Sequence, residues 1–264
     1  MLDLSTWTAL VTGASSGIGR ELVRVLAREV RGLILVARRK QRLDELATEL
    51  IREHPTLEVA TRALDVCDRA AVEEMFFELE REGRNIDLLV NNAGVGNYGR
   101  FAVSDWNKLE AMLELNVVSA THVVHRALPQ MIARGFGAVL NVGSIAGIVP
   151  VPRMAAYAAS KAYLNHFSEA LRVELSDSGI VVTVLCPGPV ETEFQEVAGR
   201  KDLRPPIPKG FEVDARFCAQ QAVRALKRGR ARVIPGGLVR SAMIPVESVP
   251  KVLVRPVLKR MLAR

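Results

Sequence analysis

The chain has 264 residues, of which 49% are apolar and only 5% are aromatic, and its formal net charge is +7. This length fits one large α/β domain or two small ones, and the aliphatic composition suits parallel strands covered by helices better than a β-sandwich. Because eleven of the lysines and arginines lie beyond residue 223, with Glu247 as the one acid there, the body is near neutral and the charge does not indicate a nucleic-acid-binding protein.

Short apolar segments alternate with amphipathic segments along the chain. Strands are expected at residues 8–12, 33–37, 59–64, 86–91, 137–143, 180–186 and 232–235. Helices are expected at residues 17–30, 41–53, 69–82, 104–134, 157–178 and 214–228, with a kink or break at Pro129. This alternation predicts an α/β fold in which residues 1–236 form a single Rossmann-type, doubly wound parallel sheet of seven strands with helices on both faces.

Two regions depart from this alternation. Residues 193–210 contain three prolines and no regular apolar pattern, and irregular loops of this length often act as lids. Residues 237–264 form a basic tail, and within residues 253–264 apolar side chains recur near helical spacing. A basic amphipathic helix of this kind either makes weak contact with an anionic membrane surface or docks on its own or a partner subunit.

The sequence predicts a cytoplasmic protein without a metal site. Its first residues lack the basic and apolar segments of a secretion signal, and no uncharged apolar run reaches the roughly 18 residues that span a bilayer. Cys67, Cys186 and Cys218 are widely spaced and form no C-x-x-C pair, so we expect reduced thiols. The four histidines form no set of metal ligands.

A glycine-rich run, TGASSGIG, follows the first expected strand from Thr12 to Gly19. Glycines at positions 13, 17 and 19 would let the backbone approach a pyrophosphate, which the N-terminus of the next helix would then bind. The alternative is a glycine turn without a ligand. The position between a strand and a helix favours the dinucleotide site.

Arginines stand at the end of the second expected strand. An acidic residue there would bind the ribose 2′-hydroxyl of NAD, whereas an arginine can pair with the 2′-phosphate of NADP. After this strand no acid occurs between residue 38 and Asp44. The sequence therefore favours NADP(H) over NAD(H), with Arg38 as the main contact and Arg39 next. The alternative is a solvated basic turn.

Tyr157 and Lys161 lie four residues apart, and Ser144 precedes Tyr157 by thirteen residues. On a helix this spacing places the first two on one face, where the ammonium is expected to lower the pKa of the phenol. Tyr157 would then donate and accept a proton near neutral pH, and Ser144 could bind the oxygen that exchanges it. A tyrosine and a lysine at this spacing also arise by chance as a solvated pair, so the case for chemistry depends on the rest of the chain.

The motifs, taken in order, resemble those of the short-chain dehydrogenase/reductase family over about residues 6–236. The glycine-rich run is followed by Asp65 with Val66, and then by NNAG at residues 91–94. Further along the chain come Asn116, Ser144, YAASK at residues 157–161 and PGPVET at residues 187–192. Any one of these motifs could be chance, but the ordered set is hard to obtain otherwise.

The resemblance implies a role for each matching residue. Tyr157 would be the general acid/base, Lys161 would lower its pKa and bind the nicotinamide ribose, and Ser144 would hold the substrate carbonyl. Asn116 would position a water of a proton relay, and Asn91 would tie neighbouring strands. Together with the glycine and arginine patterns, the implied cofactor contacts are Gly13, Ser15, Ser16, Gly17, Ile18, Gly19, Arg38, Arg39, Asp65, Val66, Asn92, Ala93, Gly94, Tyr157, Lys161, Pro187, Gly188, Val190 and Thr192.

Some of these residues have structural alternatives. Asn116 could cap a helix kink, Asp65 could end a strand, and Thr192 could cap the start of a helix.

The expected function is NADP(H)-dependent transfer of hydride between the nicotinamide and a carbonyl or secondary alcohol. Alternatives are a 3-ketoacyl-thioester reductase, a non-catalytic NADP-sensing protein and a membrane-peripheral scaffold. The resemblance implies a homodimer or homotetramer. An apolar ketone or aldehyde is favoured by the apolar residues near the expected pocket, which are Val95, Ile145, Val149, Val151, Met154 and Phe194.

Overall fold

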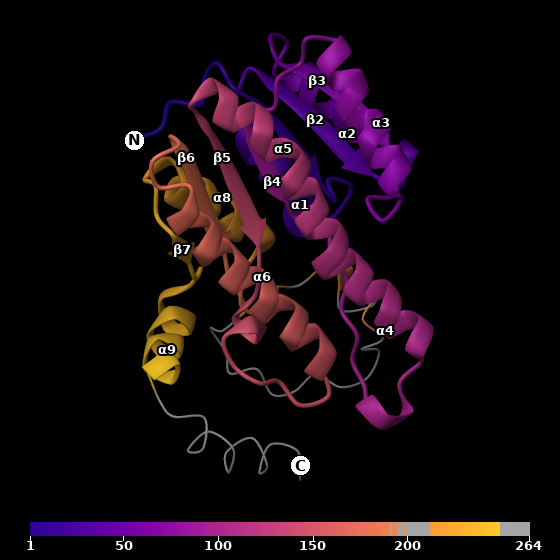
Figure 1. The fold of residues 1–264 in the computed structure, drawn as a ribbon, viewed down its shortest axis with the longest axis vertical. Helices are drawn as coiled ribbons and strands as arrows, with labels where there is room; N and C mark the ends of the chain where they lie inside the picture. Colours follow the sequence, from indigo (N-terminus) through magenta and orange to yellow (C-terminus); the bar gives the residue numbers. More distant parts are fainter. Residues whose placement is uncertain (191, 195–197, 199–211, 249–264) are drawn as a thin grey trace.

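The computed structural model describes residues 1–190, 192–194, 198 and 212–248 (Figure 1). Seven parallel strands form one sheet in the order β3-β2-β1-β4-β5-β6-β7, which confirms the Rossmann-type, doubly wound fold. The strand order reverses between β1 and β4, and such switch points are where α/β sheets bind ligands. The strands are β1 (Thr8–Thr12), β2 (Gly32–Ala37), β3 (Glu58–Ala63), β4 (Leu88–Asn91), β5 (Gly137–Val142), β6 (Ile180–Leu185) and β7 (Arg232–Val233).

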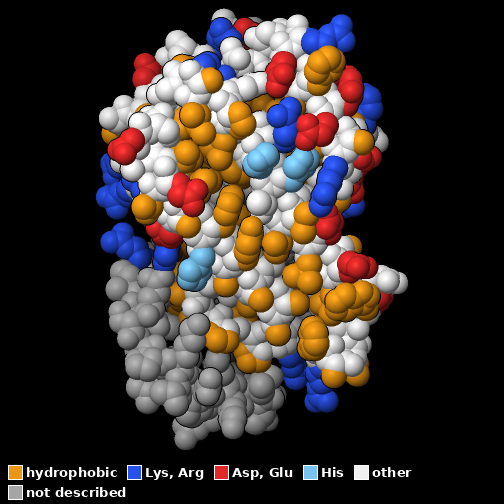
Figure 2. Space-filling model, in the orientation of Figure 1, with side chains coloured by type: hydrophobic (Ala, Val, Ile, Leu, Met, Phe, Trp, Pro, Cys, Tyr) orange, Lys and Arg blue, Asp and Glu red, His pale blue; other side chains and the backbone are white. Residues whose placement is uncertain are grey.

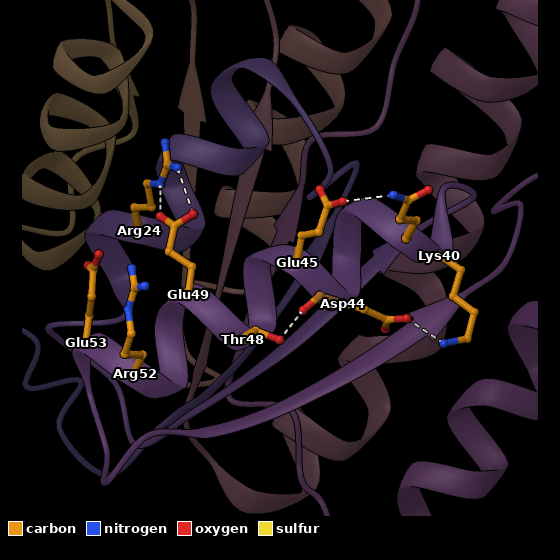
Figure 3. Close-up of a pocket in the computed structure, with 9 residues that line it drawn as sticks. Arg24, Lys40, Asp44, Glu45, Thr48, Glu49, Arg52 and Glu53 are labelled. Carbon is orange, nitrogen blue, oxygen red and sulfur yellow. Dashed lines mark hydrogen bonds and ion pairs between the residues drawn. The ribbon is translucent and has the colours of Figure 1, made fainter.

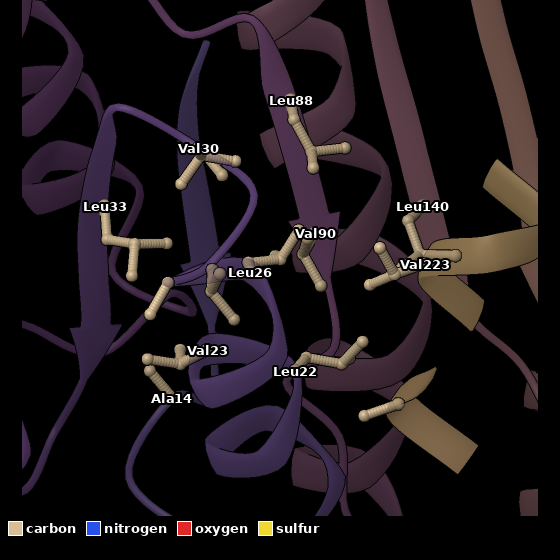
Figure 4. Close-up of a cluster of buried hydrophobic side chains, with 14 of the residues drawn as sticks. Ala14, Leu22, Val23, Leu26, Val30, Leu33, Leu88, Val90, Leu140 and Val223 are labelled. Atoms are coloured by element: carbon tan, nitrogen blue, oxygen red, sulfur yellow. The ribbon is translucent and has the colours of Figure 1, made fainter. Parts of the chain in front are cut away.

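Helices pack on both faces of this sheet because successive strand residues point to opposite sides. In β1, Ala9 and Val11 pack against α1 (Gly17–Leu26), α2 (Lys40–Glu53) and α8 (Ala215–Lys227). Figure 4 shows part of the same cluster, with Leu22 and Leu26 of α1 near Val223 of α8 and Val90 of β4. Leu10 points the other way, toward α3 (Arg69–Arg81), α5 (Ala120–Arg134) and α6 (Ala155–Glu174).

Two helices lie beyond the sheet. In Figure 1, α4 (Trp106–Leu113) and α9 (Gly237–Ser248) lie below the arrowhead of β5. The sequence pattern placed residues 237–248 in the basic tail and did not indicate α9. Residues 253–264, where an amphipathic helix was expected, lie outside the described residues, as does most of the expected lid at 193–210.

The helix expected at residues 104–134 begins at Trp106 and is not α-helical throughout. After α4, the segment Glu114–Ser119 is π-helical, and α5 follows directly. Single-turn π segments insert an extra residue into a helix and often occur at functional sites. Apolar periodicity does not reveal them, because the residues on both sides keep a helical pattern. α5 runs through Pro129 to Arg134, so no helix break occurs there.

Other helix ends differ from the expected ones by a turn or less. α1 ends at Leu26 and not at residue 30, because Glu29 and Val30 both donate their N–H groups to the Leu26 carbonyl in a closing turn. α6 ends at Glu174, four residues before the expected end. None of the helices in the described part of the chain is both long and apolar enough to cross a membrane.

Candidate active site

The residues singled out by the sequence come together at one edge of the sheet. The glycine-rich turn follows β1, the arginines follow β2, and residues 92–94 follow β4. Ser144 follows β5, and residues 187–190 follow β6. Because all seven strands are parallel, their carboxyl ends share this edge, which includes the switch point between β1 and β4.

The glycine-rich turn is shaped for close approach of a backbone. Gly13 and Gly17 have φ angles of +66° and +54°, a region that side chains disfavour. A Cβ on Gly19 would lie 2.3 Å from both Asn92 Nδ2 and Gly13 O. Ser16, the N-cap of α1, makes no side-chain capping bond, and the first helical turn carries no acid. The turn therefore fits a cofactor pyrophosphate.

Thr12 ties this turn to the loop after β4. Its Oγ1 accepts hydrogen bonds from the N–H groups of Asn92 and Ala93, both at 3.0 Å. The Asn92 side chain donates in return to Thr12 O at 2.9 Å. Sequence reasoning assigned Thr12 no role, although the residue begins the glycine-rich run.

A buried amide chain links β4, β5 and α6. Asn91 Nδ2 donates to Asn141 Oδ1 at 3.0 Å and to Ala120 O at 2.9 Å. Asn141 Nδ2 donates in turn to Ser168 Oγ at 2.9 Å. These contacts agree with the strand-tying role expected for Asn91, and they fix α6 against the sheet.

Ser144 and Tyr157 form a buried pair, with exposed fractions of 8% and 7%. Burial raises the pKa of Tyr157 to about 12, and the hydrogen bond with the Ser144 side chain opposes the rise. The expected lowering of this pKa by Lys161 is therefore wrong for this structure. Loss of water around the phenol raises this pKa, and the Lys161 ammonium donates its hydrogen bond to Val142 O.

Lys161 is 4% exposed, and its Nζ donates to Val142 O at 2.9 Å. Burial lowers the pKa of Lys161 to about 8, since the ammonium is costly to hold away from water. A Cβ on Gly94 would lie 3.3 Å from this Nζ and 3.1 Å from Asn116 Oδ1. The lysine thus reaches the loop after β4.

Asn116 lies in the π-helical segment, and its amide holds the backbone of Val95. The Nδ2 donates to Val95 O at 2.9 Å and to Ser160 Oγ at 3.1 Å, and the Oδ1 accepts from Val95 N at 3.0 Å. These bonds position the loop after β4. The water-relay role stays a prediction.

Asn165 is a positioning residue that sequence reasoning missed. Its Nδ2 donates to the main-chain oxygen of Ser144 at 3.1 Å, and its side chain is 3% exposed. Asn165 lies four residues after Lys161 and eight after Tyr157, on the same side of α6. The sequence could have indicated Asn165, because it is a polar residue at the next position on the helix face that carries Tyr157 and Lys161.

The expected contacts on the outer side of the site lie at the same edge. Asp65 Oδ1 accepts from Cys67 N at 3.0 Å, while Val66 and Val190 are buried. The Pro187 carbonyl accepts from Ile145 N at 3.1 Å and so joins the segment after β6 to the Ser144 turn. The Thr192 side chain lies 3.5 Å from a Cβ built on Gly17.

The two arginines after β2 lie differently. Arg38 pairs with Asp65, with 3.4 Å between Nη1 and Oδ2, and its side chain is 71% exposed. Arg39 reaches into the glycine-rich turn, where its guanidinium donates to Ser15 Oγ at 3.0 Å and to Ser16 Oγ at 2.7 Å. Both arginines flank the position expected for the adenosine ribose.

A further groove is lined by Arg24 of α1 and by side chains of α2 between Lys40 and Glu53 (Figure 3). Its charges pair among themselves: Arg24 binds Glu49 at 2.8 Å, and Lys40 binds Asp44 at 2.6 Å. We assign it no ligand. The three cysteines are free thiols, and the described residues hold no group of three or more His, Cys, Asp or Glu side chains arranged for a metal.

A dinucleotide turn beside a hydrogen-bonded serine and tyrosine is the arrangement expected of a nicotinamide-dependent oxidoreductase. The chain belongs to the short-chain dehydrogenase/reductase family, whose model, described as short chain dehydrogenase, matches residues 7–202. As a member of this family it is an oxidoreductase that acts on an alcohol or carbonyl group with NAD(P).

Similar proteins include sulfoacetaldehyde reductase 2 of Chromohalobacter salexigens, which is 40% identical over 70% of this chain and 73% of its own. The NADP-dependent 3-hydroxy acid dehydrogenase of Shigella flexneri is 38% identical over 73% of this chain and 77% of its own. A short-chain dehydrogenase from Sphingobium yanoikuyae in complex with NADPH superposes with a TM-score of 0.82, at 31% identity over 94% of this chain and 95% of its own.

Replacing Lys161 by Met should change how stability depends on pH. Below about pH 8 the ammonium is charged in both states, so its burial cost is fully present. Between about pH 8 and the ordinary value of 10.5 the folded chain loses this proton first, and the wild type gains stability as pH rises. The free energy of unfolding of Lys161→Met, measured by urea denaturation relative to the wild type, should therefore fall by about 2–3 kcal/mol from pH 7 to pH 10.

The exposed residue Lys108 provides the control. The free energy of unfolding of Lys108→Met should differ from that of the wild type by the same amount at pH 7 and at pH 10. If the Lys161→Met difference were equally flat, the buried ammonium would not titrate as the structure indicates.

Proposed function

We propose that this protein is an NADP(H)-dependent reductase of carbonyl compounds, with Tyr157 as the proton donor. The buried Ser144–Tyr157 pair beside the glycine-rich turn supports this proposal most directly. Bound NADPH would supply hydride to the carbonyl carbon. Ser144 and Tyr157 would hydrogen-bond the carbonyl oxygen, where negative charge develops as the hydride arrives.

The protonation of Tyr157 favours the direction of reduction. With its pKa raised to about 12, the phenol holds its proton at neutral pH and can deliver it to the developing alkoxide. The Tyr157 O–H bond breaks as the O–H bond of the alcohol forms. Lys161 would bind the nicotinamide ribose, as the family resemblance implies, and a proton from solvent would restore the phenol.

Tyr157→Phe should lower kcat by about a hundredfold to ten-thousandfold, because it removes the proton donor and leaves the ring. NADPH affinity, measured by fluorescence titration, should fall by only a few-fold, since Tyr157 is one of many expected cofactor contacts and the glycine-rich turn stays intact. Tyr163→Phe is the matched control, because Tyr163 lies on the same helix but is 40% exposed. Full turnover by Tyr157→Phe would refute the proposed role.

A preference for NADP(H) over NAD(H) is supported by the residues after β2. Arg38 and Arg39 stand where an acid would be needed to bind the ribose 2′-hydroxyl of NAD. Two guanidinium groups can instead pair with a 2′-phosphate. Among similar proteins, one is named NADP-dependent, one structure holds NADPH and another holds NAD, so the proposed preference rests on the two arginines.

Arg38→Asp should invert this preference, with the ratio of NADPH to NADH dissociation constants rising at least about tenfold. The acid repels a 2′-phosphate and can accept a hydrogen bond from a 2′-hydroxyl. Arg52→Asp, at an exposed position of α2, makes the same charge change away from the site and should leave the ratio unaltered. Unchanged discrimination in Arg38→Asp would mean that other residues select the cofactor.

An apolar ketone or aldehyde is the substrate class that the pocket residues support best. Tyr157 packs in a small cluster with Leu109 and Met112, and its ring lies 5.4 Å from that of Phe194. Val95 and Met154 pack against the same cluster. Such a wall favours an apolar substituent on the carbonyl.

A second candidate, a short acidic substrate, is favoured by Arg153. This residue has a φ of +65°, an uncommon and costly conformation for a residue with a side chain. Its guanidinium lies 3.5 Å from the Tyr98 hydroxyl, and its carbonyl accepts from Gly99 N at 2.8 Å. The names of two relatives, a sulfoacetaldehyde reductase and a 3-hydroxy acid dehydrogenase, point to anionic substrates.

Arg153→Met separates the two substrate classes. If the substrate is an acid, kcat/KM for acidic aldehydes should fall about tenfold or more, while neutral aldehydes of similar size keep theirs. If the substrate is apolar, neither class should change by more than about twofold. Arg100→Met removes an exposed charge from the loop after β4 and is the control.

The surface supports a homo-oligomer, which we include in the proposal. Figure 2 shows hydrophobic side chains gathered at the lower right, over α4. Phe101, Val103 and Trp106 there are 62%, 81% and 61% exposed.

We also propose a cytoplasmic location and keep weak membrane contact by residues 253–264 as a prediction. A non-catalytic sensor would bind cofactor without turning over any carbonyl, and a membrane-peripheral scaffold would bind vesicles without activity.

A further inference from the structure

Glu193 forms ion pairs with two arginines beside the adenosine end of the proposed cofactor site. Its Oε2 lies 2.9 Å from Arg39 Nη1, and its Oε1 lies 2.6 Å from Arg42 Nη1. Both arginines hold the pKa of the Glu193 carboxyl below its usual range, Arg39 most strongly. The carboxylate comes from the segment after β6, and the two guanidinium groups come from the start of α2.

Arg39 connects this ion pair to the cofactor turn. Its guanidinium also donates to Ser15 and Ser16, which belong to the glycine-rich run. Arg42 lies one helical turn further along α2 and shares the same carboxylate. The pair of guanidiniums thus forms a site for one anion with two or more oxygens, at the end of β2 where a 2′-phosphate is expected.

The neighbours of Glu193 face the site as well. Thr192 lies against Gly17 in the glycine-rich turn, and the Phe194 ring lies 5.4 Å from the ring of Tyr157. Glu193 is therefore held in a segment that spans from the cofactor turn to the proton donor. Its carboxylate is 44% exposed, so it can leave the arginines for water.

We propose that Arg42, together with Arg39, binds the cofactor 2′-phosphate, and that Glu193 competes with this phosphate for the two guanidinium groups. Both anions need the same donors and repel each other, so only one can be held at a time. Glu193 then weakens binding of a 2′-phosphorylated nucleotide and leaves that of its unphosphorylated counterpart unchanged. The inference rests on the proposed NADP(H) preference.

Calorimetric titration of the full-length apoprotein tests this without turnover. Adenosine 2′,5′-bisphosphate and adenosine 5′-monophosphate serve as the probes, because they differ only in the 2′-phosphate. Glu193→Gln should tighten binding of the bisphosphate by about three- to tenfold, and binding of the monophosphate should stay within about twofold. Arg42→Met should weaken binding of the bisphosphate by about tenfold and leave binding of the monophosphate unchanged.

Glu45→Gln is the matched control, since Glu45 is exposed on α2 and removing it changes net charge equally. It should leave both affinities at wild-type values. Retained monophosphate binding shows that each variant is folded.

The two proposals fail separately. A wild type that binds the bisphosphate no tighter than the monophosphate refutes the NADP(H) preference. The ratio between Glu193→Gln and wild type, for the bisphosphate alone, decides the role of Glu193. If Glu193→Gln binds the bisphosphate no tighter than the wild type, or no tighter than Glu45→Gln, the competition is refuted. Wild-type affinity in Arg42→Met would remove Arg42 from the phosphate site.

Discussion

The row of polar side chains on the buried face of α6 is the constraint on which the site depends. Tyr157, Lys161, Asn165 and Ser168 all point toward the sheet, and each is less than a tenth exposed. A buried polar group without a partner costs stability, so each needs a bond from the sheet or its loops. Those bonds fix β5 and the Ser144 turn relative to α6.

One physical cause, burial, sets the protonation of both titratable groups in this row. It disfavours the charged form of each, so the pKa of Tyr157 rises to about 12 and that of Lys161 falls to about 8. The phenol therefore keeps its proton at neutral pH. A site prepared in this way is suited to deliver a proton to an oxygen that gains negative charge.

The cofactor side is governed by charge. Arg39 and Arg42 lie near the glycine-rich turn, and in this structure the Glu193 carboxylate pairs with both and offsets one of their two positive charges. Because Glu193 follows Thr192 and precedes Phe194, the same short segment touches the cofactor turn and the proposed proton donor. The proposed discrimination at the 2′ position would therefore involve the same stretch of chain that packs against Tyr157.

Sequence by itself determined the alternation of strands and helices, the glycine turn and the spacing of Tyr157 and Lys161, because these are local patterns. It missed the π-helical turn around Asn116, the contacts of Thr12 and Asn165, and the ion pair between Arg42 and Glu193. Each of those depends on a partner far along the chain, such as Val95, Ser144 or Glu193. The expected pKa of Tyr157 was wrong for the same reason. Adjacency to Lys161 is visible in sequence, whereas desolvation depends on what the folded chain packs around the phenol.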